Sequence, residues 1–370
     1  MHNRIDATID AAIADGRIVG AEVIVARQGE VLYRRAAGHF DREAGVPMPQ
    51  NAIYRLASVT KPLVAATALA MIDKGLLRLD DPVSDHLPYF RPKLTDGSTP
   101  SPTIHHLLTH TAGLTYDYRY DRRINMGLGP THGQTLDENT ALIGEQPLSF
   151  APGAGWQYSV ATDVLGAVLA RIHGGTLGEA VAAYVTGPLG MTDTGYFIAD
   201  ARRLAKPYAD GDVNAAPMED PHTLHNHLGG PTTFSPSRIF DAKSFHSGGA
   251  GMAGTPDDIF RFLETLRRGG DPILSKETVS LAFSNRIGDL PREDAGQRFG
   301  YFGAVVADPG AAQTPAAAGT VNWGGVYGHS WLVDPLNGIT MLSMSNTAFE
   351  GCLGAFPREV RNAAYAEYVL

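Results

Sequence analysis

One segment of this chain is apolar on every side of a helix. Residues 63–72 read Leu-Val-Ala-Ala-Thr-Ala-Leu-Ala-Met-Ile, and Thr67 is their one polar member. A helix without a polar face is stable when other parts of the protein surround it. The segment is also far shorter than the roughly 20 apolar residues that a membrane span needs. The sequence therefore predicts a helix over residues 58–74 in the interior of a globular protein.

The length and composition of the chain fit such an interior helix. Its 370 residues are 44% hydrophobic and 19% charged, which is typical of globular proteins. The formal net charge of −9 argues against nucleic-acid binding, which needs a basic face for phosphates. The single cysteine, Cys352, excludes an internal disulfide and a cysteine-rich metal site. No apolar stretch of signal-peptide length opens the chain, so we expect no membrane partner and a cytoplasmic location.

Strand patterns occur near both ends of the chain, and helical patterns lie between them. We expect strands over residues 21–26, 31–37, 299–307, 320–327, 329–333 and 339–345, and further helices over residues 5–15, 103–109, 162–172, 256–268 and 358–368. The middle of the chain is rich in Pro, Gly, His and Tyr and has little strand pattern. We predict a discontinuous α/β domain of residues 1–79 and 239–370, with a mainly helical subdomain of residues 80–238 inserted in it.

The interior helix begins with the motif Ser58-Val59-Thr60-Lys61. Residues three apart share a face of a helix, so the Ser58 hydroxyl and the Lys61 amine are expected to be neighbours. A serine hydroxyl becomes a nucleophile when a base removes its proton, and a lysine in apolar surroundings is a candidate for that base. Because burying a charge is costly, this pair is a candidate catalytic site. The alternative is an accidental pair at the start of a helix.

Four segments, in order along the chain, resemble recurrent segments of the serine β-lactamase-like hydrolases. They are residues 53–62 with Ser58 and Lys61, residues 103–114, residues 155–159 with Tyr158, and residues 248–258. The strand-rich C-terminal part extends the resemblance to nearly the whole chain. It implies an α/β fold of the class C β-lactamase type, in which helices flank an antiparallel sheet and a mainly helical subdomain is inserted.

Two positions distinguish the chain from class C β-lactamases. Where those enzymes have Lys-Thr-Gly on the strand beside the site, this chain has Trp323-Gly324-Gly325. A Trp-Gly-Gly sequence there resembles the family VIII carboxylesterases, which have the β-lactamase fold and hydrolyse esters. The Tyr-x-Asn motif of class C enzymes is replaced by a tyrosine motif that ends in Val160. Both changes remove polar groups that bind a β-lactam.

The resemblance implies a role for each residue of these motifs. Ser58 is the expected nucleophile that becomes acylated, and Lys61 is expected to take or share its proton. Tyr158 is expected to complete the base and to protonate the leaving alcohol. The backbone N–H groups of Ser58 and Val326 are the expected oxyanion hole.

Four further residues are expected to bind the substrate. Trp323 would form an apolar wall, and Gly324 and Gly325 would let the substrate approach the strand closely. Tyr116 follows the second segment and is a candidate for the mouth of the site. The resemblance implies no metal and no cofactor. The expected partner is a small-molecule ester, and the oligomeric state stays open.

Histidines suggest a competing metal hypothesis. The candidates are His105, His106 and His110, and in a second group His222, His225 and His227. No cysteine accompanies the second group, and the resemblance covers the first without a metal, so we expect structural roles. Tyr158 and Trp323 could likewise be packing residues, but the ordered set of segments favours the site.

The sequence thus predicts a serine carboxylesterase that hydrolyses short-chain neutral esters through a covalent acyl-enzyme on Ser58. An acyltransferase would discharge the same acyl-enzyme to an alcohol and is an alternative. A β-lactamase or D-alanyl-D-alanine peptidase is disfavoured by Trp323 and Val160. A catalytically silent scaffold of the same fold is disfavoured by the intact set of Ser58, Lys61 and Tyr158.

Overall fold

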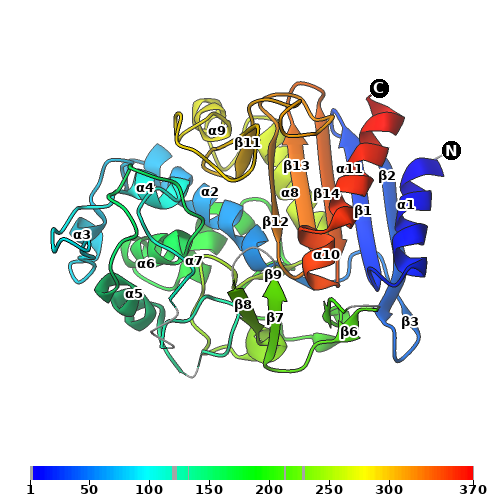
Figure 1. The fold of residues 1–370 in the computed structure, drawn as a ribbon, viewed down its shortest axis with the longest axis horizontal. Helices are drawn as coiled ribbons and strands as arrows, with labels where there is room; N and C mark the ends of the chain where they lie inside the picture. The colour runs from blue at the N-terminus through cyan, green and yellow to red at the C-terminus, as the bar shows by residue number, and fades with distance from the viewer. Residues whose placement is uncertain (1–2, 119–122, 132, 212–213, 227–229, 370) are drawn as a thin grey trace.

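Strands from both ends of the chain form one antiparallel sheet of eight strands. This computed structural model describes residues 3–118, 123–131, 133–211, 214–226 and 230–369. The strand order is β10-β11-β12-β13-β14-β1-β2-β3, so β1 pairs with β14 (Figure 1). The strands of this sheet are β1 (Gly20–Arg27), β2 (Glu30–Asp41), β3 (Val46–Pro47), β10 (Gln297–Phe299), β11 (Ala304–Val306), β12 (Val321–Gly325), β13 (His329–Asp334) and β14 (Ile339–Ser345). The predicted antiparallel sheet is confirmed.

Helices account for much of the remaining chain. The α-helices are α1 (Asn3–Ala14), α2 (Thr60–Asp73), α3 (Val83–His86), α4 (Ile104–Thr109), α5 (Leu136–Glu145), α6 (Ala161–His173), α7 (Leu177–Val181), α8 (Pro256–Arg267), α9 (Lys276–Phe283), α10 (Ala348–Cys352) and α11 (Ala355–Tyr368). The short helical segments are the 3-10 turns η1 (Ala57–Val59), η3 (Ala201–Arg203) and η4 (Pro236–Phe240), and the π-helical η2 (Ala182–Thr186). In the described part of the chain, no helix has the length and apolar character needed to cross a membrane.

Helices cover both faces of the sheet. On one face α1 and α11 lie side by side (Figure 1), and they bury Ile9 and Phe356 against Leu332 of β13. On the other face α8 buries Phe262 in the cluster that holds Val333, the next residue of β13. Because successive residues of a strand face opposite sides, both sides of the sheet are apolar. This explains why β1 is buried along almost its whole length.

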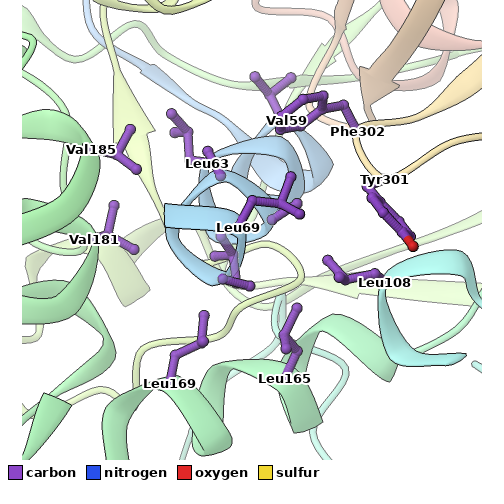
Figure 2. Close-up of a cluster of buried hydrophobic side chains, with 14 of the residues drawn as sticks. Val59, Leu63, Leu69, Leu108, Leu165, Leu169, Val181, Val185, Tyr301 and Phe302 are labelled. Atoms are coloured by element: carbon purple, nitrogen blue, oxygen red, sulfur yellow. The ribbon is translucent and has the colours of Figure 1, made fainter. Parts of the chain in front are cut away.

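The predicted interior helix is α2, and every residue from Thr60 to Met71 is buried. Leu63 and Leu69 point into apolar side chains from several segments, as Figure 2 shows. Those segments are α6 with Leu165 and Leu169, the α7–η2 region with Val181 and Val185, α4 with Leu108, and the turn that carries Tyr301 and Phe302. α2 therefore lies in the core, and its N-terminal end carries the candidate catalytic pair.

The middle of the chain contains short strands that its sequence pattern does not predict. β5 (Tyr208–Ala209) pairs with β6 (Ala216–Pro217), and β7 (His222–Asn226) pairs with β8 (Gly230–Phe234). A further pair is formed by β4 (Tyr54–Arg55) and β9 (Ala253–Gly254). These strands are two to five residues long, and four of the six contain Pro, Gly or His, so no strand pattern is visible in the sequence. The division of the chain into two domains stays a prediction.

The single strand expected over residues 299–307 is wrong, because the chain turns between β10 and β11. The turn closes with a hydrogen bond of 2.9 Å from the Gly300 N–H to the Gly303 carbonyl. A side chain at Gly300 would collide with the carbonyl oxygen of Ala282. Tyr301 and Phe302 in this turn are buried, so the apolar sequence continues where the strand does not.

Candidate active site

Ser58 lies in the turn η1, directly before helix α2. Ala57 precedes it with a φ of 45°, in the left-handed region that a residue with a side chain rarely adopts. Ala57 is fully buried among Phe234, Tyr327 and Phe349, which hold the turn in place. Ser58 is half-buried and lines a cavity of about 2460 Å³.

Lys61 is buried, as predicted, with 6% of its surface exposed. Its Nζ donates to the Gly249 carbonyl at 2.7 Å, to the Tyr116 hydroxyl at 2.9 Å and to Ser58 Oγ at 3.2 Å. A lysine ammonium has three N–H donors, and each has an acceptor here. The side chain is therefore held by three hydrogen bonds, and Ser58 Oγ, the candidate nucleophile, is one of its three partners.

Two tyrosines contact Lys61 in different ways. Tyr116 lines the cavity and accepts the hydrogen bond of Lys61, a contact that sequence reasoning missed. Tyr158 presents its ring to the ammonium, with Nζ 4.7 Å from the ring centroid, while its hydroxyl accepts a hydrogen bond of 3.3 Å from Trp323 Nε1. Burial raises the pKa of Tyr116 well above the usual value for a phenol. The two rings lie 5.3 Å apart, so Lys61, Tyr116 and Tyr158 form one cluster.

His110 packs against the ring of Tyr158. It follows α4 with a left-handed φ of 58°, and its ring lies 4.9 Å from the Tyr158 ring. Its Nδ1 lies 3.2 Å from the hydroxyl of Ser159, the next residue after the tyrosine. Burial lowers the pKa of His110 well below its usual value, so the ring is neutral. This histidine has a structural role beside the site.

His105, His106 and His222 also have protein partners. His105 Nδ1 lies 2.9 Å from the Tyr301 hydroxyl, and His106 Nδ1 accepts from the backbone N–H of Thr103 at 3.0 Å. His222 and His225 lie on β7, and His227 is outside the described residues. Across the described ranges, no group of three or more His, Cys, Asp or Glu side chains is arranged to hold a metal ion.

Strand β12 lies directly against the turn that carries Ser58. Trp323, Gly324 and Val326 line the same cavity as Ser58, whereas Gly325 is buried. A side chain at Gly325 would collide with the Leu56 carbonyl oxygen, so this glycine allows the strand to approach the turn. Gly324 faces the opposite side of β12 and is also closely packed, because a Cβ there would lie 2.8 Å from Cys352 Sγ. Burial raises the pKa of the Cys352 thiol to about 12, so it stays protonated.

Trp156, Tyr158 and Trp323 line the cavity, and the buried Phe299 packs behind them. The Trp323 ring lies 5.0 Å from Tyr158 and 5.3 Å from Phe299, and Phe299 lies 5.5 Å from Trp156. Sequence reasoning missed Phe299, because it ends a strand whose turn was not predicted. Val160 is fully buried, so it presents no group to the cavity.

Comparison with known proteins identifies the family. The model of the family described as Beta-lactamase matches residues 5–364. This chain belongs to the Beta-lactamase family. Esterase EstB of Burkholderia gladioli is 48% identical to it over 378 residues, which cover 98% of this chain and 95% of EstB.

Solved structures of the Beta-lactamase fold agree with this relationship. The structure of EstCE1, a hydrolase with promiscuous acyltransferase activity, has a TM-score of 0.93 and 40% sequence identity, and covers 98% of this chain and 97% of EstCE1. Simvastatin synthase (LovD) from Aspergillus terreus has a TM-score of 0.75 at 22% identity, with coverage of 99% and 98%, and so shares the fold. The predicted relationship to esterases, and the prediction of a serine ester hydrolase, are confirmed.

Proposed function

We propose that this member of the Beta-lactamase family hydrolyses neutral esters through a covalent acyl-enzyme on Ser58. The observation that carries the proposal is the 3.2 Å contact between Lys61 Nζ and Ser58 Oγ at the wall of a cavity that Trp323 also lines. Acyl transfer needs a serine whose proton can be removed and a pocket that holds the ester next to it. Both requirements are met at this one place.

In the proposed acylation step, Ser58 Oγ forms a bond to the ester carbonyl carbon, and its proton passes to the cluster of Lys61, Tyr116 and Tyr158. The negative charge that develops on the carbonyl oxygen would be bound by the backbone N–H groups of Ser58 and Val326, both of which line the cavity. When the intermediate collapses, the alcohol leaves with the proton held by the cluster. Water then attacks the acyl-enzyme by the reverse sequence and releases the acid.

The hydrogen bonds of Lys61 help to identify the atom that accepts the proton of Ser58. Lys61 Nζ has three hydrogen-bond partners, and two of them are hydroxyls that can donate as well as accept. For the step to balance, the cluster must hold one proton fewer than its full complement before the attack, and we infer that Lys61 and Tyr158 share this vacancy and take the Ser58 proton. Tyr116, whose pKa is raised by burial, stays a phenol. The proposal keeps Tyr158 as the acid and base, and adds Tyr116 as the phenol that is hydrogen-bonded to Lys61.

The wall of the cavity supports the proposed substrate class. Trp323 stands where a lactamase would carry a lysine, and Val160 where it would carry an asparagine. A substrate carboxylate or amide left without its partner costs about 1–3 kcal/mol for each group. An indole buries acyl or alcohol carbon atoms without requiring a charge. Short neutral esters are the substrates that meet these conditions.

Acyl transfer to an alcohol is the second candidate function. The cavity is open and extends well beyond Ser58 and Trp323, which would leave the acyl-enzyme accessible to an acceptor alcohol as well as to water. The acyltransferase activity named for EstCE1 is consistent with this candidate. Adding an alcohol to an ester assay tests it, because a transferase forms a new ester at the expense of free acid.

One screen tests the main proposal. p-Nitrophenyl esters of increasing acyl length are assayed beside a chromogenic cephalosporin, with Ser58→Ala as the blank. We expect the short esters to be the best substrates and the cephalosporin to be poor. A cephalosporin specificity constant equal to that of the best ester would restore the β-lactamase hypothesis. Failure of a fluorophosphonate to label the protein would support the scaffold hypothesis.

A further inference from the structure

We propose that Asp163 is a positioning residue of this active site, whose buried carboxylate is the counter-charge that holds Lys61 in its charged, hydrogen-bonded position. The proposal rests on the proposed function only in taking Ser58 as the nucleophile. Asp163 is the third residue of α6 and is fully buried. Its Oδ1 accepts a hydrogen bond of 2.5 Å from Ser247 Oγ, and the neighbouring Gly249 N–H also lowers the pKa of the carboxyl.

Gly249 separates this carboxylate from the lysine. The Gly249 carbonyl accepts a hydrogen bond from Lys61, and a Cβ on Gly249 would lie 2.6 Å from Asp163 Oδ2, 3.2 Å from the Tyr116 hydroxyl and 3.3 Å from Lys61 Nζ. The carboxylate, the phenol and the ammonium therefore surround one position that must lack a side chain. The two charges lie within the roughly 4–6 Å over which an opposite charge favours the ionised form of a group.

Asp163 also holds the segment that binds Lys61. Ser247 donates to Asp163 and also accepts a hydrogen bond of 3.2 Å from the Ala250 N–H, so the carboxylate anchors both sides of Gly249. A carboxylate in the first turn of a helix is further favoured by the helix dipole. The position of the Gly249 carbonyl, and through it that of Lys61, thus depends on Asp163.

The surroundings of Asp163 contain more positive than negative charge. The titratable groups that face it are Lys61 from α2, Tyr116 and Tyr118 from the segment after α4, Tyr196, and Arg238 from η4. Lys61 is also faced by Tyr158 and His110. The Arg238 guanidinium donates to the Gly129 and Phe245 carbonyls and so binds neutral acceptors. Burial raises the pKa of Asp163, while the Ser247 hydrogen bond and the Lys61 charge act in the opposite direction.

This arrangement predicts the direction of a change in the pH profile. A negative charge next to the Lys61–tyrosine cluster favours every protonated form of that cluster. Removing the charge makes the cluster lose its proton at lower pH, whichever atom is the base. The acid limb of kcat/KM must then move to lower pH. If Asp163 had only a packing role, its replacement would lower kcat/KM at every pH and leave the acid limb where it is.

The test replaces the charge by a group of the same shape. Asp163→Asn is compared with Asp258→Asn, a buried acid at the corresponding third position of α8 that hydrogen-bonds Thr194 and the Asp193 N–H instead of the catalytic cluster. The readouts are kcat/KM for a short p-nitrophenyl ester and the rate of Ser58 phosphonylation, each measured against pH. For Asp163→Asn we expect the acid limb to move down by roughly one to two pH units. For Asp258→Asn we expect no movement.

A second pair of variants covers the case in which Asp163→Asn does not fold. Gly249→Ala places a methyl group between the carboxylate and the ammonium, whereas Gly195→Ala has no atom within 4 Å of its new Cβ. We expect phosphonylation of Ser58 to slow by roughly ten- to a hundredfold in Gly249→Ala. In Gly195→Ala we expect no change.

Two results would overturn the proposal. One is an acid limb in Asp163→Asn that coincides with the wild-type limb or moves to higher pH. The other, where that variant cannot be folded, is a Gly249→Ala protein that is phosphonylated as fast as Gly195→Ala. A wild-type chain that is phosphonylated on Ser58 but hydrolyses no ester would contradict the proposed function alone, because the phosphonylation profile would still test Asp163.

Discussion

Lys61 donates a hydrogen bond of 2.9 Å to the hydroxyl of Tyr116, a residue that lies 55 positions later in the chain. The tyrosine of the Tyr158 motif meets the same ammonium with its ring face instead. A phenol that accepts a hydrogen bond from an ammonium gains more stabilisation as a phenolate than one that offers only its ring. The proposed base of this site is therefore a cluster that includes two phenols, and the contribution of each phenol can be measured.

Replacing Tyr116 by Phe should lower kcat by roughly ten- to a hundredfold and change KM little. The variant leaves one N–H of Lys61 without its acceptor and removes one phenol from the cluster. Steady-state kinetics on a short ester measure the effect. Tyr118→Phe is the matched control, since Lys61 donates its hydrogen bond to the hydroxyl of Tyr116 and not to that of Tyr118. Equal kinetics for the two variants would contradict a role for Tyr116 in the chemistry.

Lys61→Ala and Tyr158→Phe should each abolish most activity, and the double variant should be little worse than either. Groups that move one proton as a unit give such non-additive losses. The contact between the Lys61 ammonium and the Tyr158 ring is the structural basis for treating them as a unit. A double variant whose loss equals the product of the single losses would indicate independent roles.

A phosphonate should add one equivalent of mass, and peptide mapping should place it on Ser58. Ser58→Ala should lose at least about a thousandfold in turnover, as expected when a covalent nucleophile is removed. Ser247 serves as an internal comparison, because it is fully buried and donates to Asp163. Label on Ser247 or Ser330 would show that the nucleophile is misassigned.

Ala57→Gly should keep activity within a few fold of wild type, and Ala57→Val should lose most of it. The φ of 45° suits glycine, whereas a β-branched side chain is strained there. Ala57 is also fully buried, so added methyl groups would displace the turn that presents Ser58. Phosphonylation rates and melting temperatures measure both effects. An active, stable Ala57→Val protein would contradict the strained turn.

Trp323→Ala should raise KM for short esters more than it lowers kcat, and Ser58 should still be phosphonylated. The indole contributes apolar surface along the cavity and a hydrogen bond to the Tyr158 hydroxyl, while the nucleophile and Lys61 do not depend on it. Trp331→Ala would be a poor control, because Trp331 is a core residue with 2% of its surface exposed. If Trp323→Ala had unchanged KM, the indole would be a packing group.

Local patterns in the sequence were sufficient for several of these features. The apolar residues of α2 required an interior helix, because no polar face was left for water. The spacing of Ser58 and Lys61 required them to be neighbours, because helix geometry places residues three apart on one face. The ordered motifs added Tyr158 and the strand with Trp323. Each of these inferences uses residues close together in the chain or a recurrent order of short segments.

Other features had no local signal. Phe299 packs behind Trp323 because the chain turns directly after it, and the apolar sequence on both sides concealed this turn. Asp163 lies in a segment that shows only the periodicity of a helix, and nothing in that periodicity indicates a carboxylate facing the catalytic lysine. Gly249 was part of a recurrent segment, but the segment does not show why a glycine is needed there. In the structure, a side chain at this position would collide with Asp163 and crowd Lys61.

The sequence alone therefore predicted the interior helix, the neighbouring pair of Ser58 and Lys61, and the type of fold. The tertiary structure decided which phenol Lys61 binds and which carboxylate balances its charge. The physical reason is the distance along the chain over which each effect can be read. Helix spacing and burial patterns involve residues close together in the sequence, whereas a hydrogen bond requires only that two atoms lie about 3 Å apart in space, from whatever segments they come. Tyr116, Asp163 and Gly249 come from segments far apart in the chain, and only the packing of α2 against α6 and the following loops brings them to one ammonium.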